Sequence, residues 1–143
     1  MKYHFKVHKN KRGFWAECIE LDGCLTQGDS RADLIQNMKE ALNLYLGEPP
    51  DSKTIFSLPG KIHTGRNVVA VPVEPRVALA FLLRRTRLEN GLTQLEAAKR
   101  LGLRGLYSYQ RLENPKTANP EFETIIRIKR AFPELDFGEL LAA

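Results

Sequence analysis

Four carboxylates fall close together in the N-terminal half of this 143-residue sequence: Glu17, Glu20, Asp22 and Asp29. Converging carboxylates are the groups that hold paired Mg²⁺ ions for phosphodiester hydrolysis. Asp22 and Asp29, however, stand in turn sequences, where such side chains commonly bond to the local backbone. No readable spacing pairs Glu17 with another acid. We therefore expect no catalytic residue, no metal site and no cofactor, and the protein is not expected to be an enzyme.

The histidines and cysteines also form no reactive pattern. His4, His8 and His63 have no orienting carboxylate or nucleophile at a readable spacing, so we expect surface strand or loop residues. Cys18 and Cys24 have a spacing that matches no common zinc pattern. Without an export signal, reduced thiols that pack as small apolar groups are expected at both positions.

A different constellation lies in the C-terminal half, in GLTQLEAAKRLGLRGLYSYQRLEN at residues 91–114. Thr93 and Glu96 predict a capping box at the start of one helix, and Gly102 predicts the turn that follows it. A second helix is expected at 106–113, which gives a helix-turn-helix whose second helix lies in the DNA major groove. The candidate DNA-binding residues are Gln94, Leu106, Tyr107, Ser108, Gln110 and Arg111.

This segment resembles the Cro/C1-type (XRE) helix-turn-helix family in its G-L-T-Q start, its L-G turn and the L-E pair that closes the second helix. The resemblance implies that Gln94 contacts a DNA phosphate. It also implies that Leu106, Tyr107 and Arg111 occupy base-facing positions, where Arg111 can pair with guanine. Glu113 matches a glutamate that is more often structural.

The elements of the N-terminal half follow from hydrophobic periodicity. Alternation of Tyr3, Phe5 and Val7 predicts a strand, and the helix that follows has apolar residues at helical spacing. Asp29 or Ser30 is expected to cap that helix. The predicted strands are 3–8, 14–19, 24–27 and 68–73, with the helix at 31–46. Pro72 lacks an N–H group, which favours a sheet edge or a strand end.

The C-terminal half predicts helices only. A first helix is expected at 76–90, followed by the two helices of the motif. Asn119 and Pro120 predict the start of a fourth helix, with asparagine as cap and proline at the first helical position. Asp136 predicts the cap of a last short helix. The fold class is therefore α+β, with a β-β-β-α-β domain at 1–75 and an all-α five-helix domain at 76–143.

Charge and composition narrow the function classes. Residues 1–75 carry 10 basic and 9 acidic side chains, whereas residues 76–143 carry 12 and 8, so most of the net charge of +5 lies in the second half. Such a distribution favours a polyanion partner for that half. No apolar run approaches the length of a membrane span, and the N-terminus lacks the apolar run of a secretory signal. A cytoplasmic protein without membrane contact is expected.

The N-terminal half resembles the HicB-type antitoxin family, through a glycine-aromatic strand, L-D-G-C, T-Q-G-D-S and a helix with K-E-A-L within residues 13–46. This resemblance implies a partial RNase H-like fold that neutralises a HicA-type toxin. Such toxins have a double-stranded-RNA-binding-domain-like fold and cleave messenger RNA with a histidine. The helix-turn-helix then lets the pair repress its own operon through operator double-stranded DNA.

An RNA-binding toxin must be basic, so the expected toxin-binding acids are Glu17, Glu20, Asp22 and Asp29. Trp15 is expected either at that contact or in the core. A homodimer or higher homo-oligomer is expected, because one helix-turn-helix buries too little DNA surface for tight specific binding. The alternative function is a helix-turn-helix repressor whose N-terminal half senses a small ligand without a toxin partner.

Overall fold

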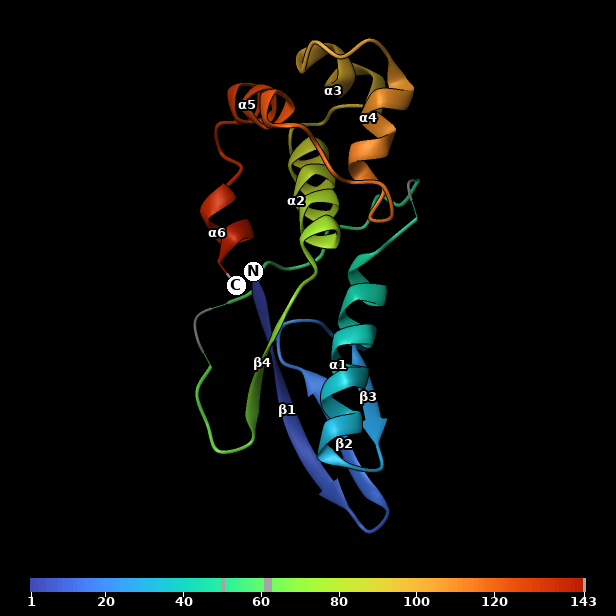
Figure 1. The fold of residues 1–143 in the computed structure, drawn as a ribbon, viewed down its shortest axis with the longest axis vertical. Helices are drawn as coiled ribbons and strands as arrows, with labels where there is room; N and C mark the ends of the chain where they lie inside the picture. Colours follow the sequence, from blue (N-terminus) through green and yellow to red (C-terminus); the bar gives the residue numbers. More distant parts are fainter. Residues whose placement is uncertain (50, 61–62, 143) are drawn as a thin grey trace. The chain divides into compact units, whose positions relative to one another are not determined.

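The computed structural model describes residues 1–49, 51–60 and 63–142 of the chain (Figure 1). It forms two compact units. The N-terminal unit comprises Met1–Leu46 with Phe56–Glu74 and Ala142, and the C-terminal unit comprises Gly47–Ile55 with Pro75–Leu141. The class is α+β, as predicted: a four-stranded antiparallel sheet in the first unit and helices in the second.

The N-terminal unit has the predicted β-β-β-α-β order. Its elements are β1 (Lys2–Asn10), β2 (Gly13–Cys18), β3 (Leu25–Gly28), α1 (Arg31–Leu46) and β4 (Val68–Pro72). The strands lie in the order β3-β2-β1-β4 and every neighbouring pair is antiparallel. Strand β4 is thus an edge strand, so the missing N–H group of Pro72, its last residue, interrupts no inner ladder.

The helix α1 covers one face of this sheet (Figure 1). Ser30 caps it, because the Ser30 hydroxyl accepts a hydrogen bond from the N–H of Asp33 at 3.1 Å. The apolar stripe of α1 is buried against the inward side chains of the strands. These buried residues are Leu34, Met38, Leu42 and Leu46 from α1, with Tyr3, Phe5, Val7 and Ala16 from the sheet.

Alternation turns the remaining strand side chains toward the opposite face. Cross-strand pairing sets His8 opposite Trp15 and Glu17 opposite Leu25. We call this the outer sheet face and define it by His8, Trp15, Glu17, Ile19 and Leu25. Ile19 and Leu25 are exposed, so this face presents apolar side chains to solvent.

The C-terminal unit contains the five helices α2 (Pro75–Glu89), α3 (Gln94–Arg100), α4 (Leu106–Glu113), α5 (Phe122–Ala131) and α6 (Phe137–Leu141). Their shared core joins α2, α3, α4 and α5. It consists of Leu83, Ala97, Ala98, Leu101, Tyr109, Leu112, Ile128, Phe132 and Leu135. Asp136 caps α6 as predicted, because its carboxylate accepts the N–H groups of Gly138 and Glu139.

The predicted start of the fourth C-terminal helix is wrong. Helix α5 begins at Phe122, its N-cap is Glu121 with extended backbone, and no side chain caps it. Asn119 and Pro120 lie outside the helix. Ala118, just before them, is buried in a cluster with Leu79 and Ala80, so tertiary packing holds this segment and moves the helix start beyond the local signal.

Candidate functional site

The first candidate site is built on α3 and α4, which are joined by a short turn. Thr93 accepts a hydrogen bond from the N–H of Glu96, and the Glu96 carboxylate accepts the N–H of Thr93, so the predicted capping box is confirmed. Gly102 ends α3 with a φ of +68°, a left-handed conformation that favours glycine.

A buried hydrogen-bond network centred on Glu113 joins α2, α3 and α4. The Arg87 guanidinium donates to both Glu113 carboxylate oxygens, at 2.6 and 3.2 Å. The Tyr109 hydroxyl donates to Glu113 at 2.9 Å, and the Gln94 amide donates at 2.8 Å. Gln94 also accepts a hydrogen bond from Gln110 at 3.3 Å. The first residue of α3 is therefore bonded to two residues of α4.

The electrostatics of this network stabilise the ion pair. Burial alone would lower the pKa of Arg87, but the hydrogen bond and charge of Glu113 outweigh it and leave that pKa above its usual value. Burial, followed by the negative charge of Glu113, raises the pKa of Tyr109. Glu113 is only 2% exposed, so its carboxylate bonds to buried partners and does not face solvent. This agrees with the structural role expected for it.

The predicted DNA-binding residues lie on or near one side of the α3–α4 pair. Tyr107 is 71% exposed and Leu106 is 39% exposed. Arg111 is exposed and its guanidinium lies 6.0 Å from the centre of the Tyr107 ring. Ser108 and Gln110 are half-buried. Together with the bonded Gln94, these residues form what we call the α3–α4 face.

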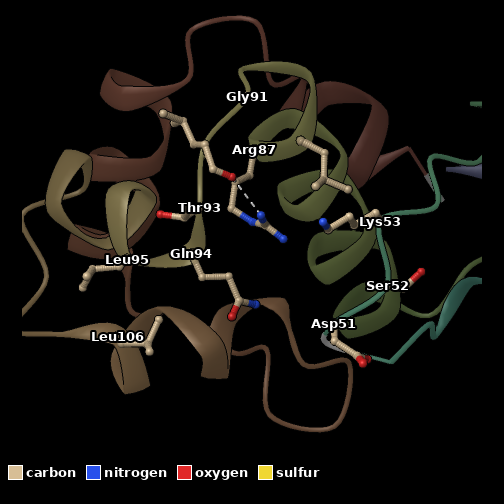
Figure 2. A pocket seen from close by; sticks show the side chains of 11 residues that line it. Asp51, Ser52, Lys53, Arg87, Gly91, Thr93, Gln94, Leu95 and Leu106 are labelled. Carbon is tan, nitrogen blue, oxygen red and sulfur yellow. Dashed lines mark hydrogen bonds between the residues drawn. The ribbon is translucent and has the colours of Figure 1, made fainter.

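A groove of about 550 Å³ adjoins the α3–α4 face. Figure 2 shows Gln94 and Lys53 on opposite sides of it, with the nitrogen atom of Lys53 toward the groove. The sequence reasoning missed Lys53, since it lies in the 47–66 segment with no motif around it. A hydrogen bond joins the start of this segment to α2, because Arg84 donates to the Glu48 carbonyl at 3.2 Å.

The second candidate site is the outer sheet face. The His8 ring stacks on the Trp15 ring, with centroids 4.1 Å apart and planes 17° from parallel. Its Nε2 lies 3.0 Å from the Glu17 carboxylate. Trp15 is half-buried on this face. It is therefore neither a fully buried core residue nor a fully exposed contact residue, the two positions expected for it.

The prediction of a surface position is wrong for His4, which has a buried carboxylate partner. His8 is a partly exposed strand residue, as predicted, although it too has a carboxylate partner. The His4 N–H donates to Glu20 at 3.0 Å, and the His4 Nδ1 lies 2.5 Å from the other Glu20 oxygen. The His4 ring is buried and His63 meets it edge-on, so His4 is no surface residue. These pairs depend on strand register, which single-strand alternation does not reveal.

Only some of the predicted toxin-binding residues lie together. Trp15 and Glu17 share the outer sheet face. The side chain of Glu20 is 6% exposed and is held by His4. Asp22 is exposed in the turn after β2, while Asp29 is exposed at the other end of that strand, beside Gly13. The five residues are therefore spread along β2 and do not form a single cluster.

The Glu20 pair predicts a pH-dependent stability. Burial would raise the pKa of Glu20, but the hydrogen bonds from His4 outweigh it and bring the pKa below its usual 4.5. The stabilisation is therefore present above pH 4.5 and is lost as the pH falls through the folded-state pKa. Glu20→Gln should lower the free energy of unfolding by about 1–2 kcal/mol at pH 7, with the difference shrinking below pH 4.

Urea denaturation at pH 7, 5 and 3, followed by the fluorescence of Trp15, measures this difference. Asp22→Asn is the control, since its carboxylate is exposed and no described histidine bonds to it. A constant difference between Glu20→Gln and the parent across this pH range would contradict the assignment.

The cysteines are buried free thiols. The N–H of Cys18 donates to the Cys24 carbonyl at 2.8 Å, which continues the β2–β3 pairing by one residue. The side-chain hydrogen bond that Cys18 makes to Cys24, with burial, raises the pKa of Cys18. Within residues 1–49, 51–60 and 63–142, no group of three or more His, Cys, Asp or Glu side chains is arranged to hold a metal ion.

Comparison with known proteins matches about half of this chain to a shorter relative. No protein-family model matches the chain. A "UPF0150 protein" of Helicobacter pylori strain J99 is 32% identical over 68 residues, which are 48% of this chain and 86% of that relative. Among the described helices, none has the length and apolar composition that crossing a bilayer requires.

Proposed function

We propose that this chain, which belongs to the UPF0150 family, is an antitoxin that also represses its own operon. In this proposal the outer sheet face binds a small mRNA-cleaving toxin of the HicA type. The α3–α4 face binds operator DNA as a helix-turn-helix, and the protein acts as a homodimer or higher oligomer on an inverted-repeat site.

One observation carries the DNA-binding part: Gln94 is bonded to both Glu113 and Gln110. These bonds tie the start of α3 to α4, so a phosphate contact from Gln94 and base contacts from Tyr107 and Arg111 would keep a constant spacing. Preorganisation of this kind supports recognition, because less conformational freedom is lost on binding. The resemblance to the XRE family supports the same assignment.

The outer sheet face supports the toxin-binding part. It combines an aromatic stack, an acidic side chain and exposed aliphatic side chains, which are the ingredients of an interface with an apolar centre. Glu17 supplies the charge that attracts a basic partner. A surface charge such as that of Glu17 mainly increases the association rate with a partner of opposite charge. Trp15 and Leu25 would supply the apolar contact.

Arg111→Ala tests base reading by α4. We expect a loss of about 1–3 kcal/mol in binding free energy on the operator, with relaxed preference at one base pair, because a bidentate arginine–guanine pair is lost. Gln94→Ala should weaken binding to operator and scrambled duplexes alike. Fluorescence anisotropy with both duplexes measures this, and Lys39→Ala on α1 is the control. Equal losses on both duplexes for Arg111→Ala would contradict its role.

Leu25→Glu tests the outer sheet face. If a reading frame beside the gene of this chain encodes a small basic protein, co-expression of the two should give a complex and protect cells, and Leu25→Glu should weaken capture at least tenfold by burying a charge. Leu44→Glu is the matched control, because Leu44 is 82% exposed on α1, away from this face. If the parent chain neither captures that protein nor protects cells, the ligand-sensing repressor is the better account.

A further inference from the structure

A hollow of about 440 Å³ lies between the end of α3 and α5, and its lining is strongly basic. Four of its seven lining residues are cationic: Lys99, Arg100, Arg127 and Arg130. The other three, Leu101, Gly102 and Ala131, are uncharged, so no acidic side chain lines the hollow within the described part of the chain. Neither predicted site uses this cluster.

Two of the four cations have no hydrogen-bond partner for their side chains within the described ranges. Lys99 and Arg130 are both exposed, and neither side chain donates a hydrogen bond to another described residue. Four cations around one small volume repel each other, which is unfavourable unless counter-charge is supplied. Three carboxylates interact with these cations from outside the lining: Glu123 with Arg127, Glu96 with Lys99 and Arg100, and Glu134 with Arg100.

Arg127 removes the main electrostatic obstacle to an anion here. The last carbonyls of a helix carry partial negative charge, which disfavours anions. Arg127 donates to the Gly102 carbonyl at 2.8 Å and to the Leu101 carbonyl at 3.4 Å, so these oxygens are covered by a cation. Gly102 makes the approach possible, since a Cβ there would lie 3.0 Å from Nη1 of Arg127.

We propose that this hollow binds a ligand with neighbouring phosphate groups. A terminal phosphate carries close to two negative charges at neutral pH and a bridging or backbone phosphate carries about one, so two to four phosphates balance four cations in a volume of the size that small ligands occupy. Arginine also matches phosphate oxygens with two parallel N–H groups. The phosphates belong either to a free polyphosphate compound or to a nucleic-acid backbone.

Calorimetric titration of the full chain with inorganic tripolyphosphate tests the hollow directly. Lys99→Gln combined with Arg130→Gln should weaken binding at least tenfold, and the fold is retained because neither side chain bonds to other described residues. Arg31→Gln combined with Lys39→Gln on α1 removes the same charge elsewhere and should change binding less than twofold. Lys99→Gln alone should give an intermediate loss.

Binding of duplex DNA distinguishes the two sources of phosphate. If backbone phosphates occupy the hollow, the Lys99/Arg130 variant should reduce the slope of log affinity against log salt by about 2, and tripolyphosphate should compete with DNA. If a free polyphosphate is the ligand, tripolyphosphate binds while the DNA slope stays unchanged. The proposal is overturned if tripolyphosphate binding and the DNA slope depend no more on Lys99 and Arg130 than on Arg31 and Lys39.

Discussion

Glu113→Ala should lower the free energy of unfolding of the C-terminal unit by about 3–5 kcal/mol, the cost of leaving a buried charge without its partner. The substitution leaves the Arg87 guanidinium, the Tyr109 hydroxyl and the Gln94 amide without the acceptor that they share. If the protein binds operator DNA as proposed, that binding should also fall, because Gln94 is no longer held against α4.

Native-state hydrogen exchange of the α2 and α4 amides measures this loss, since the tryptophan of the chain reports on the other unit. Glu123→Ala is the matched control. Glu123 is 79% exposed in its side chain and lies 3.5 Å from Arg127, so its removal should cost less than about 0.5 kcal/mol. A loss below 1 kcal/mol for Glu113→Ala would show that the network contributes little to stability.

Gly28→Ala should destabilise the N-terminal unit by about 3 kcal/mol, at the upper end of the range for overpacking a tight interior. A Cβ at this position would lie 2.5 Å from the Leu34 nitrogen and 2.8 Å from the Leu34 Cα. Both are backbone atoms of α1, so no side-chain rotation relieves the clash. The requirement explains glycine in the T-Q-G-D-S segment, where β3 ends against the helix.

The fluorescence of Trp15 follows this unfolding, because Trp15 pairs across the β2–β3 ladder with Gln27, next to the substituted residue. Gly60→Ala is the control: among the residues that the structure describes, its Cβ would meet His63, at an ordinary contact distance of 3.7 Å. Equal midpoints in urea for the two variants would mean that β3 and α1 separate at little cost.

Local signals in the sequence were sufficient for most elements. Alternation of Tyr3, Phe5 and Val7 predicts β1, and the Thr93–Glu96 capping box predicts the start of α3, because both patterns act within a few residues. The predicted start of α5 was wrong, because burial of Ala118 outweighed the local capping signal of Asn119. Sequence patterns describe short-range preferences, and tertiary packing decides between them where they compete.

The contacts that build the candidate sites were harder to predict. Glu113 was expected to be structural, but its partner Arg87 lies 26 residues away and no local spacing connects them. Stacking of His8 on Trp15 depends on the β1–β2 register, which the turn length and the hydrophobic faces set together. The basic hollow is lined by residues of both α3 and α5. Its four cations stand as two pairs far apart in the sequence, and neither pair alone predicts a cluster.

The assignment of Gly47–Ile55 to the C-terminal unit has a consequence for how this protein can be recombined. The chain enters that unit, returns to complete the sheet with β4, and then enters it again at Pro75. A single cut after residue 75 therefore does not yield two whole modules, since it strips the C-terminal unit of residues 47–55, whose Glu48 carbonyl accepts from Arg84. Exchange of the C-terminal unit between relatives requires transfer of both pieces together.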